Sequence, residues 1–128
     1  MSLRDYVPSY FTLEHRDDVS IARFALARVT DEENIELLGH ELFQLVEQYD
    51  RRKLVLHLDS VEYVTSSVLG KFITLHRRIH RRNGRLVLCG PSPMVRDALR
   101  ISRLIDYFHV TDDLPQALDA LGHDGAAS

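Results

Sequence analysis

The stretch that decides the fold covers residues 54–70 and reads LVLHLDSVEYVTSSVLG. Residues 53–58, at its start, place apolar side chains on both faces of a strand, which is typical of a sheet covered on both sides. A loop follows, and Thr65 or Ser66 can cap the helix that comes next and runs to about residue 82. This stretch therefore predicts a buried strand, a loop and a helix.

The predicted helix carries an apolar stripe at helical spacing. Its members are Leu69, Phe72, Ile73, His76 and Ile79. Asn83 and Gly84 end the helix, because a residue with left-handed backbone commonly stands there. Residues 85–89, RLVLC, predict the next strand.

Upstream, residues 11–14 and 19–24 predict two strands of a hairpin, with turn residues between them. Thr30 and Glu33 fit a capping box at the start of a helix of about five turns. The apolar face of that helix consists of Ile35, Leu38, Leu42, Leu45, Val46 and Tyr49.

Downstream, Ser92 and Pro93 suit the N-cap and the first position of a further helix. Residues 107–110 predict a last strand, and Thr111 or Asp112 caps a final helix over residues 114–121. Strands that alternate with helices imply parallel pairing with right-handed crossovers. The predicted fold class is therefore α/β, with a mixed, mostly parallel sheet of four to five strands and helices packed against it.

The chain of 128 residues suits one domain, predicted over residues 11–121. Residues 1–10 form a lead-in and residues 122–128 a flexible tail. No apolar run is long enough for membrane insertion, and the first residues lack the apolar core of a secretory signal. The formal net charge of −3 argues against direct nucleic-acid binding. The single cysteine, Cys89, excludes an internal disulfide, and the expected location is cytoplasmic.

Motifs for cofactors and catalysis are missing from the sequence, which has no GxGxxG, GxxxxGK[ST], HExxH or CxxC. His76 and His80 stand four apart on one helix but lack a third metal ligand. Cys89 is interpreted as a buried structural thiol. Asp59 follows a strand as a phospho-accepting aspartate does in receiver domains, but the acidic pair and the lysine of such a site are absent. We therefore expect no cofactor, no metal and no enzyme activity.

Two other features leave alternatives open. One is a run of arginines, which is either a solvated helix face or a docking patch for an acidic partner. Its members are Arg77, Arg78, Arg81, Arg82 and Arg85. The other is Thr65-Ser66-Ser67, which is either a plain helix cap or a place where a phosphate on Ser66 would be tolerated, because the helix N-terminus favours negative charge.

From residue 11 to residue 121 the sequence resembles the STAS domain family, whose bacterial members include anti-sigma factor antagonists. The resemblance rests on residues 54–70, on Asn83-Gly84-Arg85 with the strand after it, and on residues 103–108, RLIDYF. The family's hallmark is Asp-Ser-Ser/Thr-Gly at the start of the helix after the central strand. On that pattern Ser66 is the implied phosphoacceptor, while Thr65 replaces the aspartate and Val68 the glycine.

The resemblance implies a regulatory protein that binds an anti-sigma factor, often a serine kinase, and is released when Ser66 is phosphorylated. The implied partner-binding residues are Tyr63, Thr65, Ser66, Ser67, Val68 and Lys71. Because Thr65 carries no charge, any kinase contact that depends on the aspartate is lost. The alternative is a scaffold or transport-associated STAS module that docks constitutively. A small enzyme or a nucleotide binder is the rival from another class.

Overall fold

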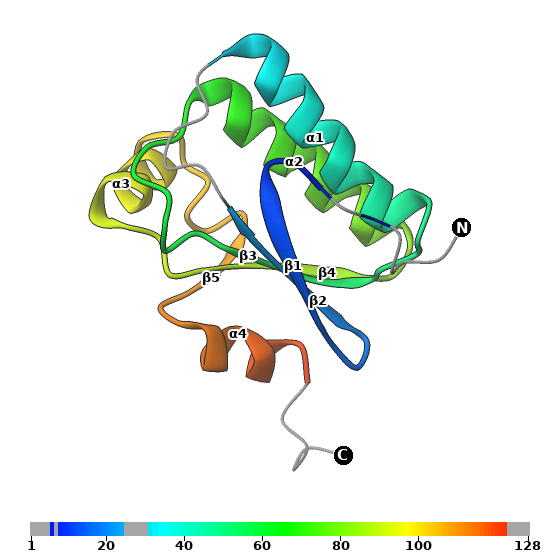
Figure 1. Ribbon diagram of the computed structural model, residues 1–128. Helices are drawn as coiled ribbons and strands as arrows, with labels where there is room; N and C mark the ends of the chain where they lie inside the picture. The colour runs from blue at the N-terminus through cyan, green and yellow to red at the C-terminus, as the bar shows by residue number, and fades with distance from the viewer. Residues whose placement is uncertain (1–5, 7, 25–30, 123–128) are drawn as a thin grey trace.

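A computed structural model describes residues 6, 8–24 and 31–122. These residues form one five-stranded sheet in the order β1-β2-β3-β4-β5 (Figure 1). The strands are β1 (Phe11–Arg16), β2 (Val19–Phe24), β3 (Lys53–His57), β4 (Arg85–Cys89) and β5 (His109–Thr111). β1 pairs antiparallel with β2, and the remaining neighbours pair in parallel. The predicted fold class, a mixed and mostly parallel sheet, is confirmed.

Helices cover both faces of this sheet. They are α1 (Glu32–Glu47), α2 (Ser66–Arg81), α3 (Pro93–Ile101) and α4 (Leu114–Ala120). α1 and α2 lie side by side over one face, whereas α4 lies under the other (Figure 1). No helix among the described residues is both long and apolar enough to cross a bilayer.

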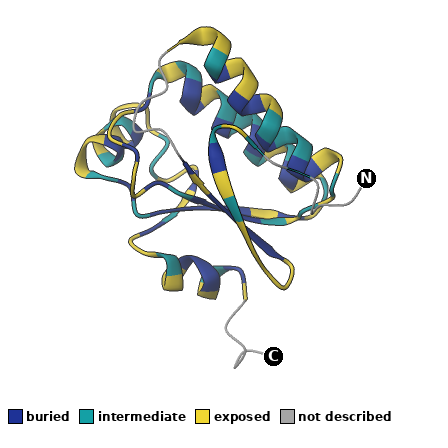
Figure 2. Cartoon of the chain, in the orientation of Figure 1, coloured by how far each residue is buried: buried dark blue, intermediate teal, exposed yellow. Residues whose placement is uncertain are grey.

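The central strands alternate between two cores, as the period of two along a strand requires. Leu54 and Leu56 of β3 join the larger core, which α1, α2 and α3 cover. Val55 joins the smaller core beneath α4, together with Val87 of β4. Figure 2 shows the central strands and the inner faces of the helices as buried, whereas most of β1 is exposed. Apolar side chains on both faces of β3 are thus explained by two covering layers.

The start of α1 differs from the prediction. Asp31 is the N-cap, and its carboxylate accepts a hydrogen bond of 2.9 Å from the N–H of Glu33. Thr30, the predicted cap, lies outside the described residues. Asp caps a helix as well as Thr does, so the helix begins one residue later than the capping box indicated.

The buried stripe of α2 was predicted wrongly at two positions. Ile73 and His76 are only partly buried, whereas Val68 and Leu75 are buried in their place. The reason is that α2 packs against the sheet and α1 together, which turns its buried face toward the α1 side.

The last strand and the last cap also differ. β5 begins at His109 rather than at residue 107, because Tyr107 and Phe108 belong to a turn whose N–H groups donate to the carbonyl of Leu104. α4 is capped by Asp113, whose carboxylate accepts a hydrogen bond of 3.0 Å from the N–H of Gln116. Thr111, one of the two predicted caps, is part of β5.

Other predicted ends are confirmed. Asn83 has a φ of 61° after α2, and its left-handed backbone turns the chain toward β4. Ser92 caps α3 by accepting a hydrogen bond of 3.2 Å from the N–H of Val95, and Pro93 occupies the first helical position.

The described part of the predicted lead-in contacts α1. The Glu41 carboxylate accepts hydrogen bonds of 2.7 Å and 3.2 Å from the N–H groups of Ser9 and Tyr10. The Tyr10 hydroxyl donates to Asn34 at 2.7 Å. Beyond Gly122, the predicted tail falls outside the described residues, so both domain boundaries stay predictions.

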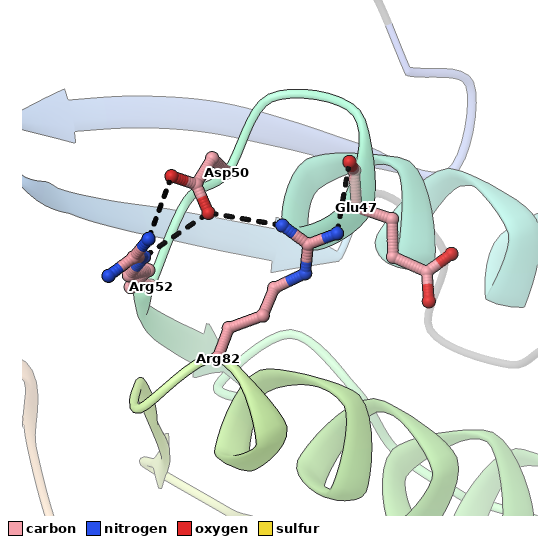
Figure 3. A network of polar contacts seen from close by, with 4 residues as sticks. All are labelled: Glu47, Asp50, Arg52 and Arg82. Atoms are coloured by element: carbon pink, nitrogen blue, oxygen red, sulfur yellow. Dashed lines mark hydrogen bonds and ion pairs between the residues drawn. The ribbon is translucent and has the colours of Figure 1, made fainter.

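Ion pairs join the C-terminal ends of α1 and α2 (Figure 3). Arg82, just after α2, donates to the Asp50 carboxylate at 3.2 Å and to the Glu47 carbonyl at 3.4 Å. Arg52 donates to the same carboxylate at 3.2 Å. The hydrogen bonds from Arg52, with those from Arg82, hold the pKa of Asp50 below its ordinary value. The two helices are therefore tied together at this end by exposed charges, each of which contributes little stability.

Candidate binding surface at the start of α2

The three hydroxyls at the start of α2 have three different environments. Thr65 is the N-cap, and its Oγ1 accepts a hydrogen bond of 3.2 Å from the N–H of Val68. Ser67 donates a hydrogen bond of 2.8 Å to the carboxylate of Glu32, at the start of α1. Ser66, the first helical residue, is exposed, and its hydroxyl has no hydrogen bond to any described residue. Ser66 is therefore the hydroxyl of this group that a second protein can reach.

Lys71 points toward α1. Its ammonium group lies 2.7 Å from the Glu36 carboxylate, and its methylene stem lies against Gly39. The two contacts hold the side chain on the ridge between the helices. Lys71 therefore forms an ion pair with Glu36 and is not positioned to pair with a phosphate on Ser66.

The remaining predicted contacts divide by burial. Tyr63 is 41% exposed in the loop before α2, while Val68 is only 4% exposed. Val68 and the ring of Tyr63 border the same small apolar hollow, whose floor includes Phe24 and Phe72. Val68 therefore shapes the surface from below, and Tyr63, Ser66 and Ser67 form its outward part. We call residues 63–67 the α2 start surface.

Two carboxylates beside this surface come from α1 rather than from α2. The first turn of α2 contains no acidic residue. Glu32, which accepts from Ser67, and Glu36, which binds Lys71, both belong to a helix about 35 positions earlier. Sequence reasoning missed both glutamates, because no local pattern shows which helix lies beside α2.

Asp59 lies beside Arg23 and His57. Its carboxylate accepts hydrogen bonds from the Arg23 guanidinium, one of them at 3.1 Å, and His57 lies 3.7 Å away. Burial acts to raise the pKa of Asp59, but the hydrogen bonds from Arg23, the neighbouring His57 and the charge of Arg23 together outweigh burial and lower it. Its carboxylate thus serves an ion pair at the strand ends, unlike the metal-bound aspartate of a receiver domain.

Cys89 is buried in β4. Burial, and to a smaller extent Asp59 and Asp113, raises the pKa of the thiol to about 12. The thiol is therefore protonated at neutral pH, as expected for a structural cysteine and not for a nucleophile.

Within the described part of the chain, His76 and His80 have no third potential metal ligand beside them. Their rings stack with centroids 6.0 Å apart, and no group of three potential ligands occurs among the described residues. Burial, with a contribution from His80, lowers the pKa of His76. Burial, with a contribution from Arg51, likewise lowers that of His15.

Stability should therefore depend on pH near neutrality. Both histidines have folded-state pKa values below the ordinary 6.5, so the unfolded chain binds more protons as the pH falls below 6.5. We expect the free energy of unfolding to fall between pH 7 and pH 5, and the double variant His15→Gln/His76→Gln to show a smaller fall. Urea denaturation at each pH measures this. His40→Gln, at an exposed position on α1, is the control. If the free energy of unfolding of the double variant fell with pH as steeply as that of the wild type, the assignment to His15 and His76 would be contradicted.

Comparison with known proteins places this geometry in a family. A family model described as STAS domain matches residues 10–117. A Bordetella bronchiseptica protein, BtrV, described as a candidate anti-sigma factor antagonist, is 31% identical over 109 residues, which cover 85% of this chain and 91% of that protein. The anti-sigma F factor antagonist of Paenibacillus polymyxa is 24% identical over 109 residues, covering 85% and 92%. The chain belongs to the STAS domain family.

Solved structures agree on the fold. A Thermotoga maritima protein described as a candidate anti-sigma factor antagonist superposes with a TM-score of 0.77 at 23% identity, covering 87% of this chain and 93% of that one. The phosphorylated form of the Bacillus cell fate determinant SpoIIAA gives a TM-score of 0.66 at 21% identity, covering 86% and 97%. The resemblance to the STAS family that the sequence indicated is confirmed.

Proposed function

We propose that the protein is an anti-sigma factor antagonist that binds an anti-sigma factor of the serine-kinase type through the α2 start surface. The observation that carries the proposal is the exposed Ser66 hydroxyl at the first residue of α2, which makes no hydrogen bond to any described residue. The relatives described as anti-sigma factor antagonists support the choice of partner class. On this proposal the protein acts in the cytoplasm by binding and catalyses no reaction of its own.

Phosphorylation of Ser66 would act as the switch. The kinase transfers the terminal phosphoryl group of ATP to Ser66 Oγ, which gives up its proton, and ADP leaves. The ester adds about −1.5 to −2 charges at neutral pH. The N–H groups in the first turn of the helix can donate hydrogen bonds to this anionic group, so the helix need not refold. The nearby Glu32 carboxylate and the apolar hollow under Tyr63 make the same charge unfavourable at a protein interface.

The two departures from the family pattern affect recognition more than fold. Thr65 keeps the capping role, and Val68 is absorbed in the core. However, no carboxylate stands in the first turn of α2. That observation favours a second candidate function, a constitutive STAS scaffold that docks through the same surface without phosphorylation.

Substitution of one exposed tyrosine tests the docking surface. We expect Tyr63→Ala to weaken binding to the anti-sigma factor at least tenfold, about 1.4 kcal/mol, because an exposed aromatic beside an apolar hollow is typical of an interface anchor. Tyr107→Ala is the matched control, since Tyr107 is 42% exposed but lies in the turn before β5. Isothermal titration calorimetry gives both affinities. Equal affinities of the two variants, or a larger loss for Tyr107→Ala, would overturn the assigned surface.

A further inference from the structure

A groove of about 470 Å³ lies at the other end of α2, away from Ser66. One wall is the C-terminal half of α2, and the other is the start of β4 with the turn that leads into β5. Its polar and aromatic lining consists of His76, His80, Asn83, Arg85, Tyr107 and His109. We call this the basic groove.

The structure divides the arginine run into two groups. Arg78 lies 3.1 Å from the Glu47 carboxylate, and its guanidinium stands 4.2 Å from the centre of the Phe43 ring. Arg82 is bound to Asp50, as described above (Figure 3). These two side chains connect α2 to α1 and are already neutralised.

The other three arginines have no such partner. Arg77, Arg81 and Arg85 are exposed, and within the described ranges none has a carboxylate within ion-pair distance. Arg85 lines the basic groove, while Arg77 and Arg81 lie on the exposed face of α2 and are not among its lining residues. One uncompensated guanidinium group therefore lines the groove, and two more stand on the exposed face of the helix that forms its wall.

An aromatic wall completes the groove. The ring of His76 packs against Tyr107, with centroids 4.9 Å apart, and against Phe108 at 5.8 Å. Its Nδ1 atom is buried and has no hydrogen-bond partner among the described residues. Tyr107 stays 42% exposed, so a flat apolar ring stands beside the cations. Such a combination suits a chain whose acidic and apolar side chains alternate.

The sheet edge is open along the groove. β5 pairs with Val87, Leu88 and Cys89 of β4. Arg85 and Leu86, at the start of β4, therefore have no β5 residue beside them. Leu86 and His109 both line the hollow. An open strand edge offers room for an extended segment.

We propose that the basic groove binds an extended acidic peptide segment of a partner protein. Carboxylates match the planar donors of the three arginines, which can bind them in bidentate fashion. A peptide is favoured over nucleic acid because the whole chain carries a formal net charge of −3, which opposes a long polyanion. The inference does not rest on the proposed function, since α2 spans 16 residues and its two ends lie about 24 Å apart.

Fluorescence anisotropy with a labelled octaglutamate peptide tests this inference on the full chain. We expect binding that weakens as salt rises, and at least a tenfold loss of affinity for Arg81→Gln/Arg85→Gln. Arg78→Gln/Arg82→Gln removes the same number of charges from the neutralised group and should lose less than threefold. Circular dichroism confirms that both variants are folded.

Other outcomes would overturn the proposal. These are no binding of octaglutamate to the wild-type chain, equal losses in the two double variants, or tenfold tighter binding of a labelled twelve-residue oligothymidylate. Ser66→Asp should leave octaglutamate binding within twofold, and a tenfold change would show that the peptide binds at the α2 start surface instead. This arm separates failure of the groove from failure of the proposed antagonist function.

Discussion

Gly84→Ala is expected to lower the free energy of unfolding by about 3 kcal/mol, the upper part of the usual range for overpacking. Gly84 is buried in the turn between α2 and β4. A methyl group there would stand 2.3 Å from the Arg52 carbonyl oxygen and 2.8 Å from Ile79 Cγ1. The Arg52 carbonyl cannot easily yield, because it accepts a hydrogen bond of 2.7 Å from the N–H of Arg85. The added methyl group must therefore push β3 away from this turn.

Gly70→Ala is the matched control, and it is expected to raise the free energy of unfolding rather than lower it. Gly70 is exposed within α2, and an added methyl group would meet nothing within 4 Å. Alanine is favoured over glycine in a helix by roughly 0.5–1 kcal/mol. Urea denaturation with a common slope compares the two variants. A loss below 1 kcal/mol for Gly84→Ala, or equal effects at both glycines, would contradict the close approach seen at Gly84.

Local patterns were sufficient to predict most of the fold. The apolar residues of 53–58 and 85–89 predicted strands covered on both sides, and two cores on opposite faces of the sheet account for them. The cap at Ser92 and the left-handed residue at Asn83 were predicted because each depends on a few adjacent residues. Caps failed by one or two positions where equally good capping residues stood side by side, as at Asp31 and Asp113.

The candidate surfaces were only partly predictable. Sequence indicated Ser66 and its neighbours, but not that Ser67 and Lys71 bind glutamates of α1, since those contacts depend on which helices become neighbours. The same holds for the arginines. Spacing along α2 does not reveal that Arg78 pairs with Glu47 of α1 and Arg82 with Asp50 just after α1, while Arg77 and Arg81 have no such partner among the described residues.

A single negative charge on Ser66 is expected to weaken binding of the anti-sigma factor ten- to hundredfold, about 1.4 to 2.8 kcal/mol. A carboxylate placed in an apolar interface loses hydration, and Lys71, five residues further along α2, is bound to Glu36. The fold should not suffer, since an acidic residue in the first turn of a helix stabilises it by about 0.3–1 kcal/mol. Ser66→Asp should therefore lose affinity while its thermal stability is unchanged or higher.

Two variants separate charge from loss of the hydroxyl. Ser66→Ala removes the hydroxyl without adding charge, and we expect its affinity to stay within threefold of the wild type. Ser102→Asp adds the same charge at an exposed serine after α3 and should leave affinity within twofold. A large loss for Ser102→Asp would show that overall charge, rather than its place, decides binding.

The most direct test of the account is a calorimetric titration of the anti-sigma factor with the wild-type protein and with Ser66→Asp under the same conditions. We expect a dissociation constant at least tenfold larger for Ser66→Asp. Equal dissociation constants would contradict it, and would leave a STAS scaffold that docks regardless of charge at the start of α2.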